Sequence, residues 1–356
     1  MPLALSLVNR GDGSRTKPHG RDQMLRKSLL AATAFAAAAL ATQAASAADL
    51  VRLGNLKFAH YGAVSYMKEI AGKYDLKIEE RVFAKGIDIL PAIVAGEIDV
   101  AASAVDAAIA GRASGVPIYA VAGFAKGGAR IVAKPDAGIK SIADLKGKKV
   151  ATPRGGAQEL ILLAELAKHG LSWSDRPGKD VQIVYMAYAD MNQALLAGSI
   201  DAMSQSEPQS SQAINKGFGV EVVKPYDTEL GEPVRSLVVT EDFYKKKPDV
   251  AQRLVRCFVE ATATFIANPD LAESYVREKM FKGQLSSQDF KDAIGNSPYS
   301  YDISVHHVQV TTDMMQKFGV GRMDSPPKAE DWVKLDLLEK AKAGAKAADA
   351  GTVKAN

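Results

Sequence analysis

Cysteine is nearly absent from this sequence, since Cys257 is the single one among 356 residues. An internal disulfide and a zinc site built on several cysteines are therefore excluded. Histidine is scarce too, and of the five only His306 and His307 are close together in the sequence. Adjacent side chains on a helix or strand point in different directions, so this pair would chelate a metal poorly. We expect no metal site.

An excess of one charge and a membrane-spanning apolar run are also missing. The chain has 45 basic and 41 acidic residues, 47% hydrophobic residues and 24% charged residues. This composition is ordinary for a soluble globular protein and excludes a disordered or collagen-like chain. The length suits two domains of common size or one large α/β unit.

The first 47 residues carry the whole charge excess. They contain six basic and two acidic residues, a net of +4, which leaves 39 basic and 39 acidic residues in the remainder. Arg26 and Lys27 precede the apolar run Leu29–Leu40, and Ala45-Ser46-Ala47 follows. This is the order of regions in a secretory signal peptide, and the run is shorter than the roughly 20 residues that span a bilayer.

We therefore predict that residues 1–47 are a signal peptide, that cleavage occurs near Ala47-Ala48, and that the mature protein is exported and soluble. The start codon is Met1 or Met24, because residues 1–23 add nothing to the signal. The alternative is a buried N-terminal helix. No cysteine lies near the cleavage point, so lipid attachment there is excluded.

Strand and helix patterns alternate from Leu50 onward and indicate an α/β protein with mostly parallel sheets. The pattern runs from residue 51 to 122 and restarts at residue 150. Ala92–Asp99 and Ala194–Asp201 share the form A-x-x-A-G-x-I-D, a helix end, a glycine and a buried strand. Strands are predicted at 51–58, 77–83, 98–102, 118–122, 129–134, 150–152, 181–186, 200–204 and 236–240, and helices at 64–74, 87–94, 104–112, 160–167, 191–197 and 251–265.

The restart predicts two similar lobes. Residues 48–133 and 237–340 are assigned to lobe 1, residues 134–236 to lobe 2, and residues 341–356 to a flexible tail. The chain then passes between the lobes twice, near Arg130 and Leu237, and two such crossings make a hinge.

Patterns for catalysis and cofactor binding are absent or incomplete. Ser65–Lys68 fits S-x-x-K, but the S-D-N and K-T-G motifs that accompany it in serine β-lactamases do not occur. No G-x-S-x-G, no G-x-G-x-x-G after a strand and no G-K-[ST] is present. No basic stripe remains once the leader is set aside. We expect no catalytic residues, no cofactor and no nucleic-acid partner.

A binding site is predicted where strands end. Thr152–Ala157 lies between a strand and a helix, where glycines let the backbone approach a ligand and the helix N-terminus attracts anions. An ordinary capped helix with a glycine-rich turn explains the same residues equally well. Further polar and aromatic residues follow other strands and could face the same cleft. The candidate ligand-binding residues are His60, Tyr61, Gly62, Ser103, Gly123, Phe124, Thr152, Arg154, Gly155, Gly156, Ala157, Tyr188 and Glu207.

From about Leu53 to Phe265 the chain resembles the periplasmic substrate-binding proteins of nitrate/sulfonate/taurine-type ABC importers, the SsuA/THI5-like or NMT1 group. The most specific matching segment is Ile139–Val150, which follows I-x-S-x-x-D-L-K-G-K-x-V. Gly115–Ile118, Ala197–Ala202 and Glu207-Pro208 also match in order and spacing.

The resemblance implies a type II, two-lobed Venus-flytrap fold with C-terminal helices, closing on a small ligand. It places the ligand's acidic group at the helix start Gly155–Ala157, with the loops of Tyr61, Ser103 and Gly123 nearby. Taurine and sulfonate binders often have Ser or Thr at that helix start, which this chain lacks. Enzymes of the pyrimidine-synthesis branch carry a cysteine-rich motif, which a single cysteine cannot supply.

The resulting hypothesis is a monomeric, non-enzymatic binding protein that delivers a small, anionic ligand to a membrane permease with its ATPase. The ligand stays open between a sulfonate, a nitrate-like oxoanion, an aromatic carboxylate and a pyrimidine precursor. Two alternatives remain: a secreted hydrolase or lyase on the same fold, and a ligand-sensing module of a membrane receptor.

Overall fold

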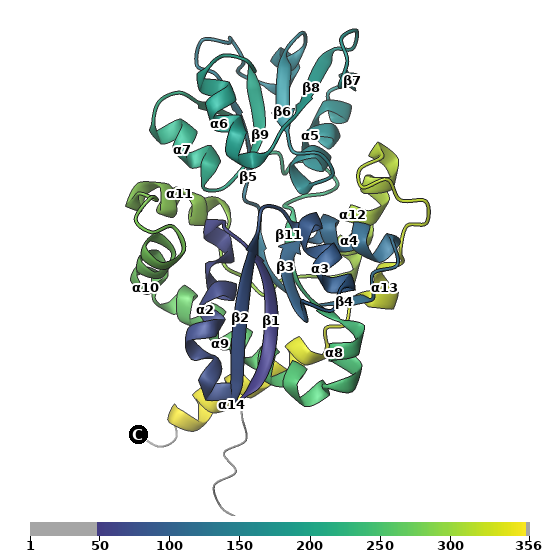
Figure 1. Cartoon of the computed structure of the whole chain (residues 1–356). Helices are drawn as coiled ribbons and strands as arrows, with labels where there is room; N and C mark the ends of the chain where they lie inside the picture. The colour runs from purple at the N-terminus through teal and green to yellow at the C-terminus, as the bar shows by residue number, and fades with distance from the viewer. Residues whose placement is uncertain (1–47, 354–356) are drawn as a thin grey trace, which may run out of the picture. The chain divides into compact units, whose positions relative to one another are not determined.

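The computed structural model describes residues 48–353, and these residues form one compact unit (Figure 1). The predicted signal peptide, residues 1–47, lies outside the described residues, which begin just after the predicted cleavage site. Among the described helices, none is both long and apolar enough to cross a membrane.

The first sheet has five strands in the order β2-β1-β3-β11-β4. Strand β1 pairs in parallel with β2 and β3, whereas β11 runs antiparallel to both β3 and β4. The residues of β4 are buried almost throughout, as expected for a strand covered on both faces. The strands span Asp49–Leu56 (β1), Leu76–Phe83 (β2), Val100–Ala104 (β3), Ile118–Lys126 (β4) and Val234–Thr240 (β11).

The second sheet has six strands in the order β10-β5-β9-β6-β8-β7. Strand β6 pairs in parallel with β8 and β9, and β5 runs antiparallel to β9. Two of these strands, β7 and β10, are short or irregular edges that the apolar pattern did not predict. The strands span Ala129–Ala133 (β5), Lys149–Thr152 (β6), Trp173–Ser174 (β7), Val181–Tyr185 (β8), Ala202–Ser206 (β9) and Val220–Val223 (β10).

Helices cover both sheets, which confirms the predicted α/β class (Figure 1). The longest, α9, begins at Pro248, where a missing N–H costs no hydrogen bond, and ends before Asn268-Pro269. The helices span Gly62–Ile70 (α2), Leu90–Val94 (α3), Val105–Ala113 (α4), Ala157–Lys168 (α5), Tyr188–Leu196 (α6), Gln209–Asn215 (α7), Glu241–Lys246 (α8), Pro248–Ala267 (α9), Pro269–Ser274 (α10), Ser287–Asn296 (α11), Val305–Phe318 (α12), Ala329–Trp332 (α13) and Asp336–Val353 (α14).

Residues 341–353, within the segment assigned to a flexible tail, are helical in the structure. Helix α14 continues from Asp336 to Val353, through the alanine-rich sequence that the prediction took as frayed. It packs against α9, and Ala341 is buried. Alanine and lysine are good helix formers, and contact with α9 supplies the stability that a short isolated helix lacks.

The repeated A-x-x-A-G-x-I-D segments fold alike in the two sheets. In each, the glycine adopts a left-handed φ of 71°, at Gly96 and at Gly198. The residue after each glycine donates its N–H back into the helix, over 2.9 Å in Ala92–Asp99 and 3.1 Å in Ala194–Asp201. Only glycine adopts this φ without steric cost, which explains why both copies keep it.

The aspartates that end the two repeated segments also have the same role. Asp99 accepts the backbone N–H of Arg52 on β1 at 3.0 Å, and Asp201 accepts that of Lys149 on β6 at 2.8 Å. Each carboxylate thus satisfies a donor of the neighbouring parallel strand, just before the first paired residues of the two strands. The first sheet's β1 and β3 therefore correspond to β6 and β9 of the second.

The chain changes sheets at Gly127-Gly128 and again between β10 and β11. Residues 129–133 were assigned to lobe 1 from sequence, but they form β5, which pairs with β9 of the second sheet. Residues 234–236, assigned to lobe 2, belong to β11 of the first sheet. Arg130 and Leu237 consequently lie within strands rather than in the connections.

Candidate functional site

A small cavity of about 40 Å³ lies between residues of the two sheets. Residues at or just after the ends of β1, β3, β6 and β9 contribute to it, so it lies at the carboxyl ends of parallel strands, where ligands bind in open α/β sheets. Seven of the thirteen candidates line it: His60, Tyr61, Arg154, Gly155, Gly156, Ala157 and Tyr188. These seven stay candidates for ligand contact.

Two of the other candidates are glycines packed against protein. A Cβ on Gly62 would lie 2.5 Å from a methyl group of Val276, and one on Gly123 would lie 2.2 Å from the carbonyl oxygen of Asp302. Both glycines therefore permit close packing by the C-terminal segments, and neither lines the cavity.

Three further candidates lie behind the cavity wall. Phe124 is fully buried and meets the Tyr61 ring edge-on at 4.7 Å between centroids. Ser103 packs against Gly86, which does line the cavity. Thr152 is fully buried at the end of β6. These side chains support the lining residues rather than face the cavity.

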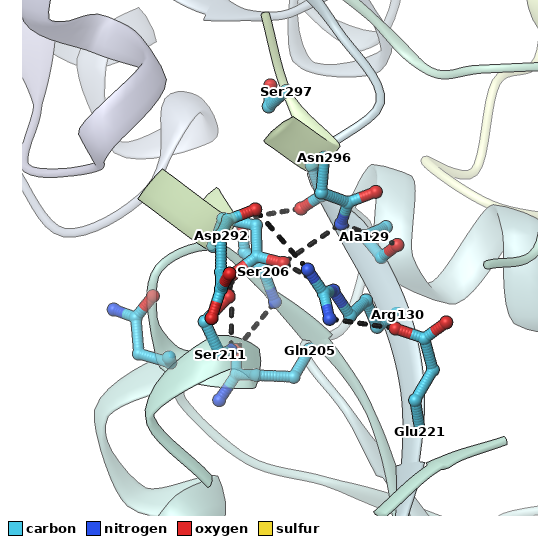
Figure 2. A network of polar contacts seen from close by, with 12 residues as sticks. Ala129, Arg130, Gln205, Ser206, Ser211, Glu221, Asp292, Asn296 and Ser297 are labelled. Atoms are coloured by element: carbon cyan, nitrogen blue, oxygen red, sulfur yellow. Dashed lines mark hydrogen bonds and ion pairs between the residues drawn. The ribbon is translucent and has the colours of Figure 1, made fainter. Parts of the chain in front are cut away.

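The thirteenth candidate, Glu207, lies in a buried ionic network. Its carboxylate is fully buried, forms an ion pair with Arg130 over 2.7 Å from Nε to Oε1, and accepts hydrogen bonds from Asn296 Nδ2 at 2.9 Å and Ser211 Oγ at 2.7 Å. Figure 2 shows Arg130 reaching on its other side toward Glu221, 2.7 Å away. The network joins β5, α7 and the end of α11, and Glu207 does not line the cavity.

The start of helix α5 is built around Gly155, whose φ of +78° favours glycine. The Gly155 N–H donates to Glu159, and the same carboxylate accepts the hydroxyl of Tyr185 at 2.5 Å. Arg154 lies over the Tyr185 ring at 3.6 Å from its centroid and pairs with Asp175 at 3.2 Å. These contacts tie the loop to its neighbours, and the Gly155 N–H already has a partner within the protein.

A buried arginine that the sequence analysis missed reaches the cavity. Arg235 on β11 is 2% exposed; its Nη2 donates to the Gly127 carbonyl at 3.0 Å and its Nε to His60 Nε2 at 3.3 Å. Its Nη1 has no partner among the described residues. Lys, Glu, Arg and Asp are almost never fully buried unless paired, so this free donor marks a position for an anion.

His60 is neutral in this arrangement. Burial, together with the Arg235 charge, lowers the pKa of His60 well below its usual value. Because Nε2 accepts from Arg235, the ring proton lies on Nδ1, which has no partner among the described residues. The cavity wall thus carries a second free N–H donor.

The cavity also contains one carboxylate, Asp106 at the first turn of α4. It is 3% exposed, and burial raises its pKa to about 6 despite the opposing charge of Arg235. The backbone N–H of Ala157 at the start of α5 faces it and lowers the pKa in part. The helix start predicted to hold a ligand's acid group is thus next to a carboxylate of the protein itself.

The sequence did contain signals for these two residues. Arg235 is a lone cation within the apolar run Val234–Val239, but the strand was predicted to begin at Ser236, which left it outside. Asp106 is the only acidic residue in the alanine-rich helix 104–112. In both cases a single charge in a segment predicted to be buried was the indicator. No group of three or more potential metal ligands lies close together in the part of the chain that the structure describes.

Known proteins resemble this chain in sequence. The profile of the NMT1-like family matches residues 31–277. A protein of Brachyspira hyodysenteriae, named as a candidate ABC transporter periplasmic binding protein, is 25% identical over 68% of this chain and 74% of its own. One of Escherichia coli K12, named as a candidate aliphatic sulfonates-binding protein, is 30% identical over 52% of this chain and 57% of its own.

A solved structure resembles the chain as a whole. The crystal structure of the periplasmic aliphatic sulphonate binding protein SsuA from Escherichia coli matches with a TM-score of 0.69 at 21% identity. The match covers 80% of this chain and 97% of that one. The predicted two-lobed periplasmic-binding-protein fold is thereby confirmed.

Proposed function

Because the chain belongs to the NMT1-like family, we propose that it is the extracytoplasmic solute-binding component of an ABC importer. It binds a small organic or inorganic anion between its lobes and delivers it to a membrane permease with its ATPase. Relatives named as periplasmic and as binding proteins support the periplasmic location and a role without catalysis. We propose that it acts as a monomer.

The anion preference rests on Arg235. Its guanidinium is 2% exposed, lines the cavity and keeps Nη1 without a partner among the described residues. A buried charge without a full set of hydrogen bonds is costly, and an anion that accepts from Nη1 removes that cost. The Nδ1–H of His60 supplies a second donor, and Gly156 and Ala157 at the start of α5 also line the cavity.

Contact with both sheets explains how binding could drive closure. Arg235 and His60 belong to the first sheet and its loops, whereas Gly156 and Ala157 begin α5 on the second. A ligand that contacts both groups at once is bound more tightly when they are close together, so it favours the closed form. A closed, loaded form is what an importer needs to recognise.

The direct test replaces the guanidinium. Arg235→Gln should weaken anion binding about 100-fold in calorimetry, because it removes a charge-assisted hydrogen bond in a buried site. Arg235→Lys should recover part of the affinity by restoring the charge. Unchanged anion affinity in a folded Arg235→Gln protein would disprove the assignment.

Gly156 provides a matched pair of variants that leaves Arg235 in place. Gly155 is unsuitable for such a pair, because its φ is +78° and any side chain there strains the backbone. Gly156 has φ of −119°, and an added Cβ would meet only the Tyr188 hydroxyl, at 3.5 Å. Gly156→Asp should abolish anion binding, and Gly156→Asn, equal in size but uncharged, should retain most of it.

A further inference from the structure

We propose that the ligand carries an aromatic ring beside its acid group, and that the ring lies in an outer groove that continues the inner cavity. The inference rests on the proposed function, because the inner cavity must hold the acid group. It goes further in naming a second subsite and in excluding a bare inorganic oxoanion as the preferred ligand.

The outer groove has about 630 Å³, against about 40 Å³ for the inner cavity. The two share five lining residues, so they lie next to each other. A water molecule needs at least about 10–15 Å³ by this measure, so the inner cavity holds roughly three atoms the size of water, enough for one acid group. The outer groove lies in the range of 300–1,000 Å³ that is usual for organic ligands. The shared residues are Phe58, Lys85, Pro153, Arg154 and Tyr188.

A series of aromatic rings leads from the inner cavity to the outer groove. The Tyr61 ring lies 5.7 Å from that of Phe58, which meets the Tyr188 ring edge-to-face at 5.4 Å. Phe83 and Tyr185, both half-buried, continue the wall of the outer groove. Rings prefer edge-to-face or offset contacts, which these walls offer to another ring.

The remaining wall of the outer groove is also suited to a flat apolar body. Met186 contributes a thioether, which packs favourably against the edge of an aromatic ring. Ala84, Pro153 and Ala187 add small apolar surfaces. An inorganic oxoanion would leave these surfaces in water, whereas a ring would cover them.

Charge fixes which end of the ligand points inward. Lys57, Lys85 and Arg154 line the groove against the single carboxylate of Asp88, so its mouth is basic. These side chains are exposed and attract anions without desolvating them. Arg235 is buried at the inner end, where a charge-assisted hydrogen bond is stronger. The acid group therefore lies inward and the ring outward.

The test compares four ligands by calorimetry on the full-length protein: benzoate, cyclohexanecarboxylate, acetate and nitrate. Benzoate should bind at least about tenfold more tightly than acetate and nitrate, because it also fills the outer groove. It should also exceed cyclohexanecarboxylate, which has similar bulk but no π system. Phe83→Leu, which keeps an apolar side chain but removes the ring, should reduce the preference of benzoate over cyclohexanecarboxylate and leave acetate affinity unchanged.

Val94→Ala is the control variant, because Val94 is exposed on α3 and lines neither space. It should bind all four ligands as the unaltered protein does. Acetate or nitrate binding as tightly as benzoate would overturn this inference and leave the proposed function intact. Equal affinities for benzoate and cyclohexanecarboxylate would overturn the aromatic specificity. Binding of none of the four, nor of sulfonate counterparts, would overturn the proposed function itself.

Discussion

Asp106 is the only carboxylate among the residues that line the inner cavity, and it faces both Arg235 and the start of α5. Its pKa is raised to about 6, mainly by burial, while Arg235 and the N–H of Ala157 oppose the rise and the charge of Glu159 adds to it. A charged Asp106 repels an anionic ligand, whereas a protonated Asp106 can donate a hydrogen bond to it. Ligand binding and proton uptake should therefore be coupled.

We predict that affinity for an anion increases as the pH falls through about 6, the pKa of Asp106. Asp106→Asn should abolish this dependence and bind the anion more tightly than the unaltered protein at pH 8, because it lacks the repelling charge. Calorimetry with benzoate between pH 5 and pH 8 measures both effects. The control is Asp242→Asn, an exposed carboxylate away from the cavity, which should keep the unaltered pH profile.

The same residue should affect stability with a defined sign. A folded-state pKa above the unfolded value of 3.8 means that Asp106 favours folding when protonated, and that this contribution is lost as the pH rises through about 6. Asp106→Asn should therefore raise the melting temperature at pH 8 and have little effect at pH 4. A pH-independent affinity, or a lower melting temperature at pH 8, would contradict this account.

At the level of elements, α11 forms a third connection to the second sheet beside the two chain crossings. The Asn296 carbonyl accepts the Gly128 N–H at 3.0 Å, and the Asn296 side chain donates to Glu207 at 2.9 Å. Asn215 of α7 donates to Asp289 at 2.9 Å. Arg235 donates to the Gly127 carbonyl. The first chain crossing, Gly127-Gly128, is therefore hydrogen-bonded to a residue of the ligand cavity and to a residue of α11.

We predict that Glu207 stabilises this connection and does not contact the ligand. Glu207→Gln should lower the free energy of unfolding in urea by about 3 kcal/mol, since it leaves part of a buried ion pair uncompensated. Anion affinity at 15 °C should stay within about twofold, because Glu207 lies outside the cavity. Glu221→Gln removes the half-exposed partner of the same arginine and should cost below about 1 kcal/mol.

A large loss of anion affinity in Glu207→Gln with unchanged stability would instead restore Glu207 as a ligand residue. Glu207 was placed among the candidates because it directly follows a strand, β9, just as the other candidates follow other strands. Its partners Arg130 and Asn296 are far away in sequence, so a local pattern contains no sign of the ion pair.

The elements themselves followed from local patterns more readily than the site did. Alternating or continuous runs of apolar residues in the sequence predicted nine strands. The predicted ends differ from the observed ones by a few residues, as for β3, which spans Val100–Ala104 instead of 98–102. The glycine and aspartate of each A-x-x-A-G-x-I-D segment act locally, so their roles could be read directly. Arg235 could not be assigned in this way, because it reaches the cavity through pairing of β11 with β3 and β4 across more than 100 residues.

At the scale of the whole molecule, charge does not explain an anion preference. The +4 of the chain belongs to residues 1–47, and residues 48–356 contain 39 basic and 39 acidic residues. We infer that most of the binding energy comes from the buried Arg235, whereas the exposed basic residues at the mouth of the outer groove attract the anion. Buried charges are screened far less by salt than exposed ones, for which the Debye length is about 10 Å at 0.1 M ionic strength.

We therefore predict that affinity for benzoate changes less than about threefold between 50 and 500 mM of a salt whose anion is too large for the inner cavity. A strong decrease with salt would mean that the exposed Lys57, Lys85 and Arg154 supply most of the binding energy. The variant Lys85→Gln separates the two cases, because it should slow association with benzoate at low salt while leaving the dissociation rate nearly unchanged. Stopped-flow measurements at both salt concentrations resolve the two rates, and a mainly faster dissociation in Lys85→Gln would show that this lysine holds the bound acid group directly.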